Sequence, residues 1–282
     1  MKFIIFYNEC LRSKIIYSQF IKKNKKNIKA VIKLPINISS KNKFFLIKKG
    51  IFNDNAYSYI LFQLFQTLIY NISSNFFFSN IEHLCKKLNI KFFELKKFPK
   101  KKELISLVEN YESKDIFFIS TTYILKHEDL MIKNPILNLH EADPKNYRGS
   151  ALYFRLANDK QEYMKTVIME PTSKIDAGRI VCSSSTQKIK NLSVFRIILT
   201  GYKLQNILMS KINKIRIKKK YPKIKNNDKS EIYSFPSRKL EKKLHKKDIE
   251  TIILKDYFFI LYLSIIKDVN KLYSKINAYL KK

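Results

Sequence analysis

Short apolar runs and helical periods alternate along the first half of the chain. Residues 2–7 (KFIIFY) and 28–34 (IKAVIKL) are apolar runs bounded by polar residues, which is typical of buried strands. Between them, residues 12–23 carry apolar side chains three and four positions apart, which predicts a helix. A strand, a helix and a second strand in this order are the usual beginning of a parallel α/β sheet.

The same alternation continues as far as residue 140. Residues 55–72 are apolar and contain neither glycine nor proline, so we expect a buried helix inserted after the second strand. The complete pattern predicts an α/β protein with a Rossmann-like, mostly parallel sheet flanked by helices. Further helices are expected over 81–90 and 101–113, and further strands over 90–95, 115–121 and 134–140.

The second half begins with two more strand candidates, at 165–170 and 178–184, which are followed by a long helix over 190–212. Residues 211–230 are basic and lose their apolar periodicity, which indicates a surface linker. The remainder is expected to contain one or two helices. We therefore divide the chain into an α/β domain over residues 1–210 and a basic, partly helical C-terminal extension over residues 211–282.

The longest apolar run, residues 257–266 (YFFILYLSII), is too short to span a bilayer. Its length favours a core helix over an interfacial one. The apolar stretch at the start of the chain is also too short for a signal peptide, and no small-residue cleavage site follows it. No transmembrane segment is expected, and the protein is predicted to be cytoplasmic.

The formal net charge of +33 is extreme. Only seven of the 56 basic residues are arginine, whereas a groove built to grip phosphate is expected to use more of them. A lysine-rich composition across the whole chain is therefore the larger cause of the charge. A polyanionic partner remains an alternative: nucleic acid, a nucleotide-linked substrate or an anionic membrane.

Several common site types find no support in the sequence. Cys10, Cys85 and Cys182 lie far apart and form no CxxC pair, so neither a zinc site nor a disulfide framework is indicated, and no metal is expected. Reduced thiols agree with a cytoplasmic location. The glycine patterns of dinucleotide sites and of P-loop triphosphate sites are also absent.

Residues 138–149 (NLHEADPKNYRG) collect residue types that are scarce elsewhere in the chain, which has only four histidines and four glycines. In a strand over 134–140, Asn138 and His140 share one face and Leu139 points to the other. They also close that strand at the carboxyl end, where parallel α/β sheets bind their ligands. An amide and an imidazole can polarise a carbonyl and hold an oxyanion, which suits transfer of an acyl group between two bound partners.

Asp176 is a third candidate, because it lies between two predicted strands and close to Gly178. A carboxylate there can orient the imidazole of His140 and help to remove the proton of an attacking ammonium group. The spacing of 36 residues between His140 and Asp176 gives no support by itself.

The order Asn-x-His, YRG, a helix, TVIME and IDAGRIV resembles the folate-dependent formyltransferases, which include methionyl-tRNA, glycinamide ribonucleotide and sugar N-formyltransferases. The resemblance covers residues 78–185 well and residues 1–35 loosely. It implies that Asn138, His140 and Asp176 form the catalytic trio. Asn138 and protonated His140 would stabilise the oxyanion, and Asp176 would position the imidazole.

The resemblance also implies a cofactor, 10-formyltetrahydrofolate, and an amine acceptor. The pterin would lie between segments 121–125 and 171–176. Arg148, Gly149 and Glu141 would lie on the acceptor side. The residues expected to bind the cofactor are Thr122, Tyr123, Ile124, Glu170 and Ile175.

The chain also departs from the family pattern. EADPKN follows His140 where the family usually has a proline and a Ser-Leu-Leu-Pro run, and the tail lacks the alternating strands of a tRNA-binding β-barrel. These departures favour an amino-sugar nucleotide of surface-polysaccharide synthesis as the acceptor. Methionyl-tRNA formylation is the first alternative, and an inactive binding protein with this fold is the second. A homodimer is an expectation from the family alone.

Overall fold

The computed structural model covers the full chain of 282 residues, and its described parts contain the whole central sheet. The described residues are 1–35, 57–96, 106, 109–120, 134–141, 144, 148–149, 163–171, 176–184, 187–188, 193–212, 232–233 and 237–281.

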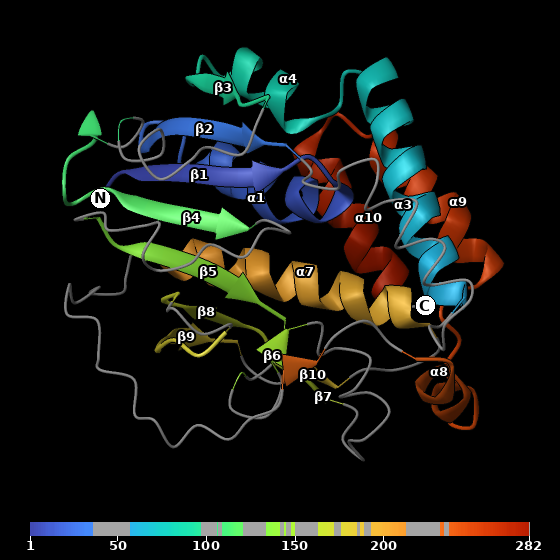
Figure 1. Ribbon diagram of the computed structural model, residues 1–282. Coiled ribbons are helices and arrows are strands. Elements are labelled where there is room, and N and C mark those ends of the chain that lie inside the picture. Colours follow the sequence, from blue (N-terminus) through green and yellow to red (C-terminus); the bar gives the residue numbers. More distant parts are fainter. Residues whose placement is uncertain are drawn as a thin grey trace.

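A seven-stranded sheet forms the centre of the protein, with the strand order β3-β2-β1-β4-β5-β8-β9 (Figure 1). The first five strands in this order run parallel, β8 pairs antiparallel with β5, and β9 pairs antiparallel with β8. The prediction of a mostly parallel, Rossmann-like α/β sheet is confirmed. The strands are β1 (Phe3–Asn8), β2 (Ile28–Leu34), β3 (Phe92–Glu94), β4 (Ile116–Ser120), β5 (Ile136–His140), β8 (Val167–Met169) and β9 (Ile180–Ser183).

Two further pairs of very short strands lie beyond this sheet. β6 (Arg148–Gly149) pairs in parallel with β11 (Ile232–Tyr233). β7 (Tyr163–Met164) pairs antiparallel with β10 (Gln187–Lys188). The first pair joins the stretch after the candidate catalytic strand to the C-terminal part of the chain.

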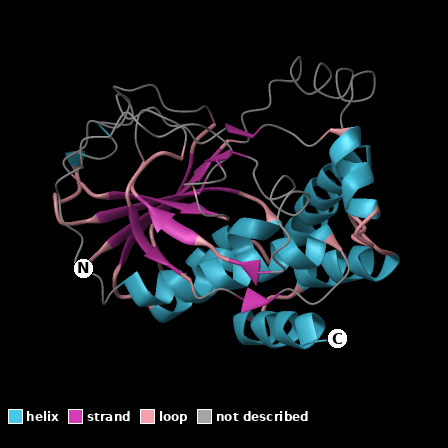
Figure 2. Cartoon of the chain, turned by 90° about the horizontal axis from the view of Figure 1, so that it is seen from below, coloured by secondary structure: helices cyan, strands magenta, loops and turns pink. Residues whose placement is uncertain are grey.

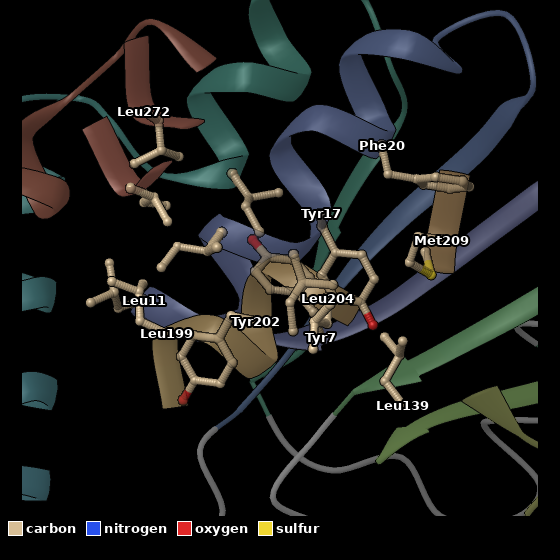
Figure 3. Packing of buried hydrophobic residues seen from close by; sticks show 14 of the residues in the cluster. Tyr7, Leu11, Tyr17, Phe20, Leu139, Leu199, Tyr202, Leu204, Met209 and Leu272 are labelled. Atoms are coloured by element: carbon tan, nitrogen blue, oxygen red, sulfur yellow. The ribbon is translucent and has the colours of Figure 1, made fainter. Parts of the chain in front are cut away.

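Helices α1 (Leu11–Lys23) and α7 (Val194–Lys211) pack against each other on one face of the sheet. Figure 2 shows most of the described helices gathered on one side of the strands. The larger hydrophobic core fills this layer, where Tyr17 and Leu204 from the helices meet Leu139 from the sheet (Figure 3). A smaller apolar cluster, to which Ile136 belongs, covers the opposite face.

Helix α3 (Tyr57–Phe76) corrects one expectation from the sequence. The pattern over 55–72 predicted a buried helix, but only one side of α3 is covered. Phe62 and Tyr70 are fully buried, whereas Leu68 is 60% exposed and Phe76 is 75% exposed. Apolar residues occur on every side of the helix, and its neighbours cover only the side that faces the core.

The described residues of the C-terminal segment form three helices instead of the expected one or two: α8 (Arg238–His245), α9 (Leu254–Ile265) and α10 (Val269–Lys281). Their buried side chains, such as Ile260 and Leu272, belong to the same core cluster as the sheet. The hydroxyl of Tyr273 donates a hydrogen bond to the backbone carbonyl of Ile15 in α1. The C-terminal helices therefore share their core with the α/β layer, and the boundary near residue 210 stays a prediction.

The apolar run 257–266 falls largely within α9, which buries one side in the core as expected and leaves another side exposed. Ile260 and Leu263 are fully buried, whereas Phe258 is 68% exposed. No helix in the described parts of the chain combines the length and apolar character needed to cross a membrane.

Candidate active site

Strand β5 places Asn138 and His140 on one face at the carboxyl end of the sheet. Asn138 pairs with Ile119 of β4 on one side and with Met169 of β8 on the other, and His140 pairs with Val167. Successive side chains of a strand alternate between faces, so both polar residues follow Ile136 on the face of the smaller apolar cluster. Leu139, between these two residues in the sequence, points to the opposite face and packs into the larger core.

The imidazole of His140 and the carboxylate of Asp176 meet at this edge. Nδ1 of His140 lies 3.6 Å from Oδ2 of Asp176, and the two side chains are only 9% and 15% exposed. This distance is longer than a hydrogen bond and within the range of an ion pair. A nearly buried carboxylate beside Nδ1 favours the orientation in which the other ring nitrogen, Nε2, faces away from Asp176.

The backbone at Asp176 explains how a loop residue reaches the ring. Asp176 has a φ of 47°, in the left-handed region that few residues other than glycine adopt. Aspartate tolerates this conformation better than most, because its short polar side chain can bond locally. The residue lies between β8 and β9 in the sequence, and its carboxylate lies beside His140 at the end of β5.

Arg12 is a residue of this region that the sequence analysis did not identify. Its Nη2 donates a hydrogen bond of 3.1 Å to the backbone carbonyl of Leu139, the residue between Asn138 and His140. Its Nε lies 3.5 Å from Oε1 of Glu141, and its guanidinium lies 6.0 Å from the ring centre of Tyr202. Arg12 therefore fixes the end of β5 from the first turn of α1. The scarcity of arginine in the chain was the one available signal for it.

Glu141 and Glu170 were expected near the acceptor and the cofactor, respectively, and each contacts an arginine. Glu141 faces Arg12. Glu170 is 3% exposed, and its two carboxylate oxygens accept hydrogen bonds of 3.0 and 2.6 Å from Nε and Nη2 of Arg179. The hydrogen bond to Glu170 raises the pKa of Arg179. This two-point contact holds the hairpin of β8 and β9, and the sequence analysis missed it.

Arg148 and Gly149, expected on the acceptor side, form strand β6. Arg148 is 3% exposed, and its backbone is level with Ile232 of β11. The other residues expected to bind the cofactor, Thr122, Tyr123, Ile124 and Ile175, lie outside the described residues.

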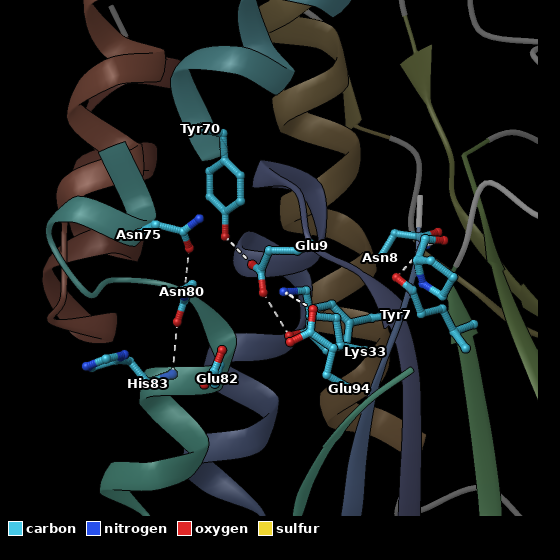
Figure 4. A network of polar contacts seen from close by, with 12 residues as sticks. Tyr7, Asn8, Glu9, Lys33, Tyr70, Asn75, Asn80, Glu82, His83 and Glu94 are labelled. Atoms are coloured by element: carbon cyan, nitrogen blue, oxygen red, sulfur yellow. Dashed lines mark hydrogen bonds and ion pairs between the residues drawn. The ribbon is translucent and has the colours of Figure 1, made fainter. Parts of the chain in front are cut away.

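A second buried carboxylate lies at the carboxyl end of β1. Glu9 accepts hydrogen bonds from the hydroxyl groups of Tyr7 and Tyr70 at 2.8 and 2.5 Å (Figure 4). Burial raises the pKa of Glu9, and the two hydrogen bonds oppose that shift. Both oxygens are therefore occupied by tyrosines, and Tyr70 joins α3 to the end of β1, which is a structural role.

The two other histidines among the described residues, His83 and His245, make contacts that give them structural roles. The ring of His83 stacks on Phe78 at 4.7 Å, and Nδ1 of His245 lies 3.2 Å from Glu250. The backbone N–H of His83 also donates to Asn80, the residue that caps α4 (Ile81–Lys87) (Figure 4). His127 lies outside the described residues.

Neither a protein-family model nor a curated protein matches the sequence. Among solved structures, the chain is similar to the N-formyltransferase of Helicobacter canadensis in complex with folinic acid and dTDP-3-aminofucose, with a TM-score of 0.49 and 18% identity over 94% of this chain and 81% of that one. It is also similar to a sugar 3N-formyltransferase with dTDP and 5-N-formyl-THF, with a TM-score of 0.48 and 17% identity over 83% and 69% of the two chains. A third similar structure is phosphoribosylglycinamide formyltransferase from Campylobacter jejuni, with a TM-score of 0.47 and 12% identity over 76% and 96%.

All three are formyltransferases. The motifs in residues 138–183 of this chain resemble the same family. At these TM-scores the comparison assigns no role to any residue of the chain, so the roles rest on the geometry of Asn138, His140 and Asp176.

Proposed function

We propose that this protein is a formyltransferase that moves a formyl group from 10-formyltetrahydrofolate to an amine, with an amino-sugar nucleotide as the acceptor. The observation that carries the proposal is the contact between His140 and Asp176, 3.6 Å apart, on the face that β5 gives to Asn138. An amide, an imidazole and a carboxylate at the carboxyl end of β5 can stabilise an oxyanion and move a proton, which suits acyl transfer to an amine.

Each of the three side chains has a separate role. The amide N–H of Asn138 and the imidazole N–H of His140 stabilise the negative charge that develops on the formyl oxygen. Asp176 is a positioning residue, since it holds the Nδ1 side of the ring and balances the charge of the imidazolium. The same carboxylate assists removal of the proton that the attacking amine must lose.

The donors at the end of β5 fit a formyl group. Asn138 is partly exposed, whereas His140 is 7% exposed, so one donor is open to a ligand and the other is held in a nearly dry environment. Hydrogen bonds in such surroundings are stronger than in water. When bound, 10-formyltetrahydrofolate supplies the one-carbon group, and the chain supplies orientation and charge stabilisation.

The charge of the chain supports an anionic acceptor. A net charge of +33 raises the local concentration of a nucleoside diphosphate ester. It would also attract tRNA, so charged methionyl-tRNA is the alternative acceptor to test. The proposed reaction places the protein in the cytoplasm, where folate and sugar nucleotides are available.

The test is formyl transfer by the purified full-length protein. Tetrahydrofolate release from 10-formyltetrahydrofolate is followed with dTDP-linked 3-amino and 4-amino sugars and, separately, with charged methionyl-tRNA. We expect release with an amino-sugar nucleotide, and a loss of at least 100-fold in kcat for His140→Ala.

The matched control is His245→Ala, which removes an exposed histidine that also faces a carboxylate, Glu250. Its kcat should equal that of the wild type. Transfer to tRNA alone would replace the acceptor proposed here. Binding of the folate without transfer to any amine would instead support an inactive binding protein.

A further inference from the structure

Helices α3 and α9 expose a set of large apolar side chains that the proposed activity does not use. Of the thirteen exposed large apolar side chains among the described residues, eight lie on these two helices. Their exposed fractions range from 42% for Leu261 to 75% for Phe76. We call this set the apolar surface: Leu61, Leu64, Leu68, Ile72, Phe76, Leu254, Phe258 and Leu261.

The two helices lie side by side and run in the same direction. Near their starts, the hydroxyl groups of Ser58 and Thr251 are 2.9 Å apart. Near their ends, the hydroxyl of Ser79, just after α3, donates to the backbone carbonyl of Ser264. Figure 1 shows α3 and α9 next to each other at the edge of the molecule.

A ring contact joins the exposed residues of both helices into one surface. The rings of Phe65 and Tyr257 meet edge to face with centroids 4.5 Å apart. Residues three and four positions away on a helix lie on the same side. Leu61 and Leu68 therefore flank Phe65, and in the same way Leu254 and Leu261 flank Tyr257.

The apolar surface is large for a surface without a partner. With roughly 100 Å² exposed on each of eight side chains, it amounts to on the order of 800 Å², above the largest patch of a typical monomer. Helix α3 contributes no charged residue over its 20 positions. Surfaces of this kind mark sites of association with a protein or a membrane.

Lysines lie at both ends of the apolar surface. At one end, α8 contacts the starts of the helices through Glu241 and Thr251 and exposes Lys242 and Lys243. At the other end, Lys267 and Lys271 are exposed just beyond α9.

We propose that the apolar surface docks on an anionic lipid bilayer. A bilayer takes up the leucine and phenylalanine side chains, and its anionic headgroups meet the lysines at both ends. A second copy of the chain is disfavoured as the occupant, because it brings a like charge of +33 and the same lysines against this region. The docking is peripheral and is independent of the site at His140.

The test is flotation of the full-length protein with vesicles of phosphatidylcholine alone and with vesicles of equal parts phosphatidylcholine and phosphatidylglycerol. We expect binding to the anionic vesicles that is at least tenfold tighter and that weakens as salt is raised. Leu68→Glu combined with Phe258→Glu should weaken it at least tenfold. The matched control is Phe93→Glu, on an exposed apolar residue of β3, which should change it less than threefold.

A second pair of variants, which lower the net charge by the same amount, tests the lysines. Lys242→Glu with Lys243→Glu should weaken binding by roughly 30-fold or more, because each lysine near an anionic surface contributes about fivefold. Lys25→Glu with Lys26→Glu makes the same charge change in the turn before β2, away from α3 and α9 (Figure 1), and should have less than a threefold effect.

Three results would overturn the proposal. The first is a wild-type protein that does not bind anionic vesicles. The second is binding that survives Leu68→Glu with Phe258→Glu. The third is a wild-type dimer in analytical ultracentrifugation that this same variant converts to a monomer, because the surface would then belong to a second copy. Far-UV circular dichroism confirms that each variant keeps the wild-type melting curve.

Discussion

Replacing Arg12 with alanine should loosen the end of β5 and thereby affect both stability and catalysis. The guanidinium donates to the carbonyl of Leu139 at 3.1 Å, and a hydrogen bond from a charged group contributes about 1.5–3 kcal/mol. The pair with Glu141, at 3.5 Å and about a quarter exposed on each side, adds about 0.5 kcal/mol or less. The contact with the ring of Tyr202 at 6.0 Å adds about 0.5 kcal/mol.

The expected loss in the free energy of unfolding for Arg12→Ala is therefore about 2–4 kcal/mol, or a Tm lowered by roughly 5–10 °C for a chain of this size. The chain has no tryptophan, so urea unfolding is followed by far-UV circular dichroism and tyrosine fluorescence. Glu141→Gln is the matched control, because it removes only the partly exposed ion pair and should cost about 0.5 kcal/mol or less.

In the formyl-transfer assay, Arg12→Ala should lower kcat by about 10- to 100-fold while KM changes little, since Arg12 acts by holding the end of β5. Arg12→Lys keeps the charge but lacks the forked guanidinium, and it should recover only part of the loss. A variant with unchanged kcat and an unfolding free energy within about 0.5 kcal/mol of wild type would refute the role given to Arg12.

Three further predictions concern single side chains. Asp176→Asn keeps a residue that tolerates a φ of 47° but removes the charge, so the protein should fold with kcat lowered about 100-fold, and an unchanged kcat would contradict the positioning role. Burial lowers the pKa of Lys14 to about 7 from its usual 10.5, so the unfolded chain binds more protons in that window. The free energy of unfolding should therefore rise between pH 7 and pH 10.5. Urea unfolding should show a smaller rise in Lys14→Met than in the wild type. An equal rise in the two proteins would show that Lys14 is not its cause. Glu170→Gln should cost about 1–2 kcal/mol in urea unfolding, because Arg179 is partly exposed, and should change the Kd for folate less than threefold; a tenfold rise would instead place Glu170 against the cofactor.

The order of elements was predictable because their patterns are local. The runs that became β1, β4 and β5 are buried on both faces, and such strands read as nearly continuous apolar sequence. Helix α7 was expected over 190–212 and spans Val194–Lys211, where the side chain of Ser193 accepts from the N–H of Arg196 and caps its start. These features depend on neighbouring residues and not on the rest of the fold.

Exposure was less predictable than element type. The sequence of α3 has apolar residues on every side, so it does not indicate which side of the helix packs against α9 and which side is exposed. The number of C-terminal helices was also underestimated. The short α8 has a strongly basic sequence, RKLEKKLH, in which only Leu240 and Leu244 mark the buried side.

The sequence by itself determined the chemistry available at the end of β5, because alternation along a strand puts Asn138 and His140 on one face whatever surrounds them. Only the tertiary structure decided what stands beside that face. Asp176 reaches His140 across 36 residues, and Arg12 reaches the carbonyl of Leu139 across 127. Neither contact produces a periodic pattern in the sequence, because each depends on how β8, β9 and α1 are arranged around β5.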